Sequence, residues 1–353
     1  MPEQDEASPI AVGLVGLGRA GWHLHAEAVA HHAALFELDA VADPFPGRAE
    51  QSAHERGCRW YADHRPLLES PDVELVVICA PTTLHCRLAV EALDAGKHVL
   101  VEKPVAISLA EIDEMVGAAR RNGRRLLASQ NRRYTADFLE LTRVLDSGVL
   151  GEVHEIRINW QSFKRRWDWQ ALAEQGGGAL LNDGSHIVDQ ALVLLGDAEP
   201  DVWHWRHRTP LAAGTAEDHL KILLTAPDQP VLDLEINYAC ALPQPTWQVL
   251  GSAGALIGTD DYLKWKYVDP DTVQPRTAVP ESPADRGYHR EDFGWTEREW
   301  SAPERYVESH HRMYLDVHTA IRQNVATHLD AALVRSQVSV LDRCRGPLSG
   351  SST

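Results

Sequence analysis

A glycine-rich turn between two short apolar runs constrains the fold of this chain more than any other feature. Residues 12–15 form the first apolar run, and Gly16-Leu17-Gly18-Arg19-Ala20-Gly21 follows it directly. Helical periodicity continues to about residue 31, and a second apolar run, 38–42, ends at Asp43. Strand, G-x-G-x-x-G, helix, strand and acid in this order are the fingerprint of a dinucleotide-binding βαβ unit. The sequence therefore predicts a Rossmann domain near its start.

Each glycine of the turn has a defined role in such a unit. Gly16 permits the tight turn, Gly18 lets the backbone approach a pyrophosphate, and Gly21 lets the helix pack closely on the strand. The N–H groups at the helix N-terminus then bind the phosphates. We expect cofactor contacts along the whole loop, at Gly16, Leu17, Gly18, Arg19 and Ala20.

Asp43 bears on the choice of cofactor. A carboxylate at this place accepts a hydrogen bond from the ribose 2′-hydroxyl and repels a 2′-phosphate. The sequence therefore favours NAD over NADP. Arg19 and Arg48 would weaken that preference if either side chain reached the 2′ position.

Strands and helices continue to alternate up to about residue 130. The pattern predicts helices over 46–57, 85–95 and 108–122, and strands over 75–79, 98–101 and 126–129. This alternation is typical of a doubly wound parallel sheet, and we assign residues 1–130 to it. Glu102-Lys103-Pro104 follows a strand, so Lys103 is expected in the crevice where such sheets bind ligands.

Residues 131–353 have a different pattern. Apolar and polar residues alternate with period two over 156–161, 203–206 and 232–238, which indicates a mainly antiparallel sheet with two unlike faces. Helices are expected over 136–147, 178–195 and 306–323, and residues 269–301 read as a surface loop or lid. We expect an α+β domain with an open-faced sheet.

The helix over 178–195 carries a candidate catalytic pair. Asn182 and His186 are four residues apart and therefore share one helix face. Asp183 and Asp189 lie three residues to either side of His186, so either carboxylate could reach the imidazole. An imidazole titrates near neutral pH and suits a general base.

A polar loop before this helix holds candidate substrate contacts. Arg165, Arg166, Trp167, Asp168 and Trp169 are consecutive. Indole rings beside charged groups suit stacking on a sugar ring and hydrogen bonds to its hydroxyls, although such tryptophans are as often structural.

Composition excludes several classes of partner. The 353 residues carry 51 acidic and 34 basic side chains, for a formal charge of -17, which disfavours nucleic acid and anionic membranes. The first eight residues resemble no secretory signal, and no apolar run reaches the length of a membrane span. The five cysteines are scattered without metal-type spacing, so we expect a cytoplasmic protein without a metal.

Several of these segments together resemble the glucose–fructose oxidoreductase, inositol dehydrogenase and rhizopine-catabolism (Gfo/Idh/MocA) family over nearly the full chain. The resemblance rests on residues 13–21, 80–85, 102–104, 131–134 and 176–189. It implies a Rossmann domain joined to an open-faced sheet, assembly as dimers or tetramers through that sheet, and NAD(P)-dependent oxidation or reduction of sugars and polyols.

Site residues follow from the same resemblance. It places the family's lysine on Lys103 and its histidine on His186, whereas the usual aspartate falls on Asn182. An asparagine can orient a hydroxyl but cannot supply a negative charge. Further cofactor contacts are expected at Ala80, Pro81, Thr82, His85, Glu102 and Lys103. Substrate contacts are expected at Tyr134, Asn182, Asp183 and His186, and the polar loop adds Arg166, Trp167 and Asp168.

The reaction expected is reversible hydride transfer from a secondary alcohol carbon to NAD⁺. His186 would take the hydroxyl proton, Lys103 would stabilise the alkoxide, and Asn182 would orient the alcohol. Three alternatives stay open: an NAD-binding sensor without chemistry, a glycosidase that oxidises a sugar carbon transiently, and an enzyme that recycles bound nucleotide between two sugars. The last carries tyrosine where this chain has His186.

Overall fold

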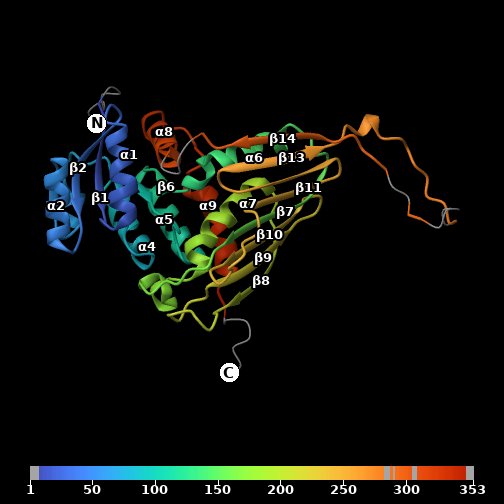
Figure 1. Ribbon diagram of the computed structural model, residues 1–353. Helices are drawn as coiled ribbons and strands as arrows, with labels where there is room; N and C mark the ends of the chain where they lie inside the picture. The colour runs from blue at the N-terminus through green and yellow to red at the C-terminus, as the bar shows by residue number, and fades with distance from the viewer. Residues whose placement is uncertain (1–7, 282–286, 289–290, 304–307, 347–353) are drawn as a thin grey trace.

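Two β-sheets with helices between them make up the protein in the computed structural model, which describes residues 8–281, 287–288, 291–303 and 308–346 (Figure 1). One sheet has six parallel strands, and the other has eight strands that are mostly antiparallel. The predicted Rossmann domain and the predicted α+β domain with an open-faced sheet are both confirmed.

The six-stranded sheet has the doubly wound order β3-β2-β1-β4-β5-β6. The winding of the chain therefore reverses between β1 and β4, and ligands of such sheets bind at the carboxyl ends of the strands beside this point. Sequence patterning missed β3, which is short and carries polar and exposed residues. The strands are β1 (Ile10–Val15), β2 (Phe36–Ala42), β3 (Arg59–Tyr61), β4 (Leu75–Ile78), β5 (His98–Val101) and β6 (Leu126–Ala128).

Helices cover both faces of this sheet. The helix after the glycine loop begins with a π-helical turn, Gly21–His25, and continues as α1 (Ala26–His31). Ser108 is the N-cap of helix α5 (Leu109–Asn122), because its Oγ accepts the Glu111 N–H at 3.3 Å. The remaining helices here are α2 (Pro46–Arg56), α3 (Arg65–Glu69) and α4 (His85–Asp94).

The second sheet has the order β14-β13-β12-β11-β7-β10-β9-β8. Strands β7 and β10 run parallel, and the other neighbours run antiparallel. Its strands are β7 (Val153–Gln161), β8 (Asp201–His207), β9 (His219–Thr225), β10 (Val231–Asn237), β11 (Trp247–Gly251), β12 (Gly254–Gly258), β13 (Tyr262–Tyr267) and β14 (Thr296–Ser301).

The inner face of the second sheet is apolar. Buried side chains such as Ile158, Ile222 and Leu224 lie in one cluster with residues of three helices. These helices are α6 (Ala136–Asp146), α7 (Ser185–Leu195) and α9 (Ala331–Arg343). The inner face therefore forms the core of the second domain.

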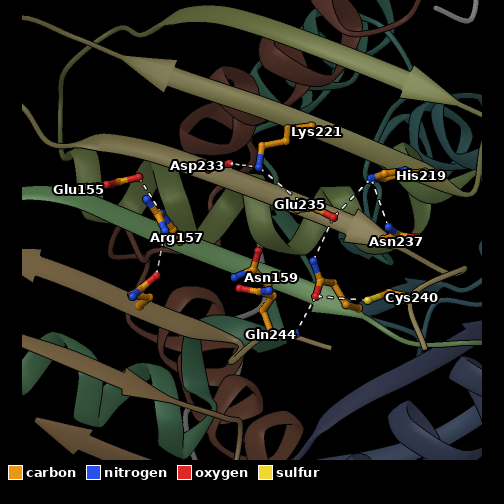
Figure 2. A network of polar contacts seen from close by, with 12 residues as sticks. Glu155, Arg157, Asn159, His219, Lys221, Asp233, Glu235, Asn237, Cys240 and Gln244 are labelled. Atoms are coloured by element: carbon orange, nitrogen blue, oxygen red, sulfur yellow. Dashed lines mark hydrogen bonds and ion pairs between the residues drawn. The ribbon is translucent and has the colours of Figure 1, made fainter. Parts of the chain in front are cut away.

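The outer face of the same sheet is polar, as period-two patterning requires. No described helix covers this face (Figure 1). Figure 2 shows charged and polar side chains there, including the Arg157–Glu155 pair at 2.7 Å. Lys221 pairs with both Asp233 and Glu235, at 3.0 and 3.4 Å. The sheet is thus open-faced.

The last two helices return to the Rossmann domain. Helix α8 (Glu308–Arg322) packs Met313 and Tyr314 into the same apolar cluster as Phe36 of β2. Helix α9 places Val334 and Val338 in a cluster with β4 and β5. The domain division at residue 130 stays a prediction. Helices α8 and α9 come after residue 130 in the sequence, yet both pack against the Rossmann domain.

Candidate functional site

A cavity of about 1110 Å³ lies at the carboxyl ends of the parallel strands. Its walls come from the loops after β1, β2, β4 and β5, from β7, and from the segment that leads into α7. This is the place where doubly wound sheets bind ligands. The cavity therefore has one end on the Rossmann domain and one on the second domain.

The glycine loop forms one end of the cavity. Gly16 has φ +92°, and a Cβ on it would lie 2.7 Å from the Cys79 carbonyl oxygen. A Cβ on Gly21 would lie 2.0 Å from the Gly16 carbonyl oxygen, so the helix could not pack as closely. A Cβ on Gly18 would meet nothing within 4 Å, and this residue lines the cavity, so a ligand can approach its backbone. These three positions fit a dinucleotide pyrophosphate.

Asp43 joins the first two loops. Its Oδ2 accepts the Leu17 N–H at 2.8 Å, and its Oδ1 accepts the Phe45 N–H at 2.9 Å. Arg48 approaches Oδ2 at 3.4 Å from a half-exposed position. A carboxylate has about four acceptor positions, so both oxygens can still accept ribose hydroxyls.

Glu102 lines the cavity and is held in place by hydrogen bonds. Its Oε1 accepts hydrogen bonds from Ser129 Oγ at 2.6 Å and from His25 Nε2 at 2.9 Å. The other ring nitrogen of His25, Nδ1, bonds to the Tyr314 hydroxyl at 2.8 Å. Burial opposes ionisation of Glu102, but His25, Lys103 and Ser129 together lower its pKa to about 2. A buried anion therefore lies directly beside Lys103.

Lys103 reaches across the cavity to the second domain. Its Nζ donates to the Asn182 carbonyl oxygen at 2.9 Å and to Asn182 Oδ1 at 3.3 Å. Burial lowers the pKa of Lys103, and the charges of Glu102 and Asp183 oppose that shift. The ammonium is thus held at a fixed place between the two domains.

Asn182 does not lie on a regular α-helix. Residues Leu180–Gly184 form a π-helical turn, and α7 begins only at Ser185. The helix expected over 178–195 therefore begins as a π turn instead of an α-helical turn, and Asn182 and His186 both line the cavity. A π turn often marks a functional site. Here the Asn182 carbonyl accepts from Lys103 Nζ and from Ser185 Oγ.

His186 lies in the cavity wall and is 6 % exposed. Within the described residues its Nδ1 has no hydrogen-bond partner. Its ring lies 5.7 Å from the Trp160 ring, and the Arg132 guanidinium lies 4.6 Å from the same indole. Burial lowers the pKa of His186 well below its usual value, and the charges of Lys103 and Arg132 add to that shift. The imidazole is therefore neutral at pH 7.

Neither carboxylate expected near His186 is bound to it. Asp183 accepts from the Tyr238 hydroxyl at 2.6 Å and pairs with Lys164 at 3.5 Å. Asp189 forms a two-pronged pair with Arg133, at 2.6 and 2.7 Å. The expected contact was wrong, because other donors hold both carboxylates.

Most of the predicted site residues line the cavity. From the cofactor set these are Gly16, Gly18, Arg19, Ala20, Asp43, Ala80, Pro81, Thr82, Glu102 and Lys103. From the substrate set they are Arg166, Asp168, Asn182, Asp183 and His186. Four predicted residues, Leu17, His85, Tyr134 and Trp167, are not among the lining residues.

Each of the four has a different environment. Leu17 is buried and acts through its N–H on Asp43. His85 lies between the Ala80 and Pro104 carbonyl oxygens, at 2.9 Å from each, and so ties two loops together. Tyr134 donates to Asp316 at 2.5 Å, away from the cavity. Trp167 is 84 % exposed.

Other lining residues escaped the sequence analysis. Gln170 lines the cavity and donates to Asn182 Oδ1 at 3.3 Å; of the two tryptophans expected in the polar loop, Trp169 lines the cavity and Trp167 does not. His310 comes from α8, and no local pattern links it to the glycine loop. Trp160 has the sequence pattern of an ordinary strand residue. Arg132 lies in the segment 131–134, one of those that carry the family resemblance, and this was its only sequence signal as a site residue.

The segment expected as a surface loop or lid lies elsewhere. Residues 296–301 form the edge strand β14, and the described residues 273–281 are a mostly exposed loop that extends away from the Rossmann domain (Figure 1). No described residue between 269 and 301 lines the cavity, so the lid hypothesis is wrong for that part. The described residues also contain no cluster suited to a metal ion and no helix able to cross a membrane.

Comparison with known proteins identifies the family. Residues 10–130 match the model described as "Oxidoreductase family, NAD-binding Rossmann fold", and residues 138–257 match the "GFO/IDH/MocA C-terminal domain". The chain belongs to the Gfo/Idh/MocA family. It is therefore an oxidoreductase of a family that binds NAD through a Rossmann fold.

Relatives of this Gfo/Idh/MocA chain cover much of its length. An uncharacterized oxidoreductase of Escherichia coli, YdgJ, is 30% identical over 80% of this chain and 79% of its own. A myo-inositol 2-dehydrogenase of Thermotoga maritima is 29% identical over 54% of this chain and 57% of its own. The WlbA dehydrogenase of Bordetella pertussis, solved with NADH and UDP-GlcNAcA, shares the fold with a TM-score of 0.75, at 21% identity over 95% of this chain and 96% of its own.

Proposed function

We propose that this protein is an NAD-dependent dehydrogenase that oxidises a secondary hydroxyl of a sugar, polyol or glycoside. One observation carries the proposal: a lysine ammonium and a neutral, buried imidazole line the same cavity as the glycine loop. The activity named for the Thermotoga maritima relative supports a polyol or sugar as substrate.

His186 acts as the general base. Burial and the neighbouring cations keep its imidazole neutral, so that it can accept the proton of a substrate hydroxyl. The His186 side chain lines the cavity, and its buried Nδ1 has no hydrogen-bond partner among the described residues. General bases of this kind contribute typically ~10²–10⁴-fold to the rate.

Lys103 stabilises the alkoxide that forms as the proton leaves. Its ammonium is held by Asn182 and is already in place before the reaction, which is the condition for effective electrostatic stabilisation. Asn182 orients the lysine and the alcohol. NAD, when bound, supplies the carbon that accepts the hydride.

The cofactor we propose is NAD rather than NADP. Asp43 keeps acceptor capacity for ribose hydroxyls, and its negative charge would repel a 2′-phosphate. Arg48 lies 3.4 Å from Asp43 and is half-exposed, so it partly offsets this charge.

We also propose a cytoplasmic homodimer or homotetramer. No described helix covers the outer face of the second sheet, and this face carries Arg157 and Trp203, which is 55 % exposed; arginine and aromatic side chains are enriched at protein interfaces. The five cysteines are free, which suits a reducing compartment. The wild type should sediment as an oligomer and R157E as a smaller species, whereas a monomeric wild type would refute the assembly.

The function is tested with the purified protein, NAD⁺ and NADP⁺ separately, and a panel of sugars, inositols, glycosides and sugar acids. Formation of NADH with at least one substrate is the expected result. Release of free sugar without net NADH would indicate the glycosidase instead. Binding of NADH without any turnover would indicate a sensor.

A further inference from the structure

A chain of hydrogen bonds beside Lys103 ends on a carboxylate. Asn182 Nδ2 donates to the Tyr238 hydroxyl oxygen at 3.4 Å, and that hydroxyl donates to Asp183 Oδ2 at 2.6 Å. Tyr238 is 7 % exposed and directly follows β10, whereas Asp183 stands next to Asn182 in the π turn. The three residues therefore link the π turn to the end of β10.

The direction of each hydrogen bond in this chain is determined. The carboxylate of Asp183 can only accept, so the single proton of Tyr238 is used there. The Tyr238 oxygen is then an acceptor and holds the Nδ2 end of the Asn182 amide. The Oδ1 end consequently faces the other way, toward Lys103 Nζ and Gln170 Nε2, each at 3.3 Å.

We propose that Asp183 and Tyr238 are positioning residues, which fix the Asn182 amide so that its Oδ1 holds the Lys103 ammonium. Through two hydrogen bonds, Asp183 and Tyr238 would compensate for the absence of the aspartate that the family usually has at position 182. The inference rests on the proposed dehydrogenase function. Asn182 accepts two of the three N–H groups of the Lys103 ammonium. The third N–H group is then directed toward a substrate oxygen.

The hydroxyl of Tyr238 keeps its proton throughout the working pH range. Burial raises the pKa of Tyr238, and the adjacent Asp183 raises it further. The polarity of the hydrogen-bond chain therefore does not reverse with pH, and Asn182 Oδ1 stays turned toward Lys103.

The test is a double-mutant cycle between Tyr238→Phe and Asn182→Asp. In the wild-type background, Y238F should lower kcat about tenfold, as expected for a hydrogen bond that acts on a charged group. In the N182D background the loss should be about twofold or less, because either carboxylate oxygen can accept from Lys103. Equal losses in both backgrounds would overturn the proposal.

A matched control is available at the edge of the second sheet. The Tyr262 hydroxyl donates to Glu299 at 2.8 Å, so Y262F removes a similar tyrosine–carboxylate bond far from the cavity. It should leave kcat unchanged. NADH affinity should be unchanged in Y238F, and a large loss of affinity would contradict a role confined to Lys103.

A second measurement does not depend on turnover. The pH dependence of Lys103 acetylation by acetic anhydride, followed by peptide mass spectrometry, reports the pKa of its amine. Y238F should move the midpoint to lower pH, since the ammonium loses a fixed acceptor, and Y262F should not. If the wild type oxidised no substrate, the proposed function would fail, and labelling would still decide the positioning role. An unchanged midpoint in Y238F would overturn it.

Discussion

The two ends of the cavity are built in different ways. At the cofactor end, the contacts come from backbone groups and from residues close in sequence, such as Gly16, Gly18 and Asp43. At the substrate end, Lys103 and His186 come from different domains and line the same cavity, and Lys103 donates to Asn182 of the second domain. The first end depends on local backbone geometry, and the second depends on how the domains pack.

The two ends of the cavity also differ in what surrounds their charged groups. Asp43 accepts hydrogen bonds from two backbone N–H groups, whereas burial and, after it, neighbouring charges shift the pKa values of Lys103 and His186 at the substrate end. Lys103 and Arg132 help to keep His186 neutral, and Glu102 with Asp183 favours the charged form of Lys103. A single substitution at the substrate end should therefore change the rate of the chemical step more than the affinity for the cofactor.

The largest effect is expected for His186→Gln. Removal of the general base should lower kcat/KM by about 10²–10⁴-fold, while NADH binding stays unchanged. Because the pKa of His186 is lowered, the acid limb of the wild-type pH profile should lie below pH ~6.5, the usual imidazole value. Steady-state kinetics measured over a range of pH values checks both the loss of kcat/KM and the position of the acid limb. The exposed His54→Gln variant is the control, and equal loss in both variants would refute the assignment.

Lys103→Ala should have the next largest effect. Loss of one donor to a developing oxyanion typically lowers kcat by about 10²–10³-fold. NAD should still bind, because the glycine loop and Asp43 remain intact. Turnover on the best substrate and NADH titration measure the two quantities. Turnover near that of the wild type would show that Lys103 is not catalytic.

The contrast between the two ends also explains what the sequence could predict. The βαβ pattern with Asp43 depends on local spacing, so the cofactor end was predictable. The π turn at Leu180–Gly184 changes the register of a segment that looks helical, and His310 reaches the cavity only through the packing of α8. Period-two patterning located β7 and β10 but not the edge strand β14, whose residues are mostly exposed.

Asp43→Ser should mainly affect the cofactor end. Removal of the carboxylate should lower the preference for NAD over NADP by about tenfold or more, with kcat at saturating cofactor little changed. Kd values for NADH and NADPH give the ratio. The control is Asp39→Ser, which removes a carboxylate that lies on β2 and pairs with Arg59. An unchanged ratio of the two Kd values in the Asp43 variant would show that Asp43 only holds the glycine loop and does not select the cofactor.

The smallest effect concerns stability toward acid. Burial is the main cause that lowers the pKa of His98 to about 4 and that of His310 to about 3, whereas the unfolded chain titrates near ~6.5. Below pH ~6.5 the unfolded state therefore binds more protons, and the free energy of unfolding falls by up to ~1.4 kcal/mol per pH unit for each such histidine. Urea unfolding at several pH values should show His98→Asn less sensitive to acid than the wild type. The exposed His54→Asn variant should keep the wild-type slope, and an equal slope in all three proteins would mean that His98 is not held neutral by the fold.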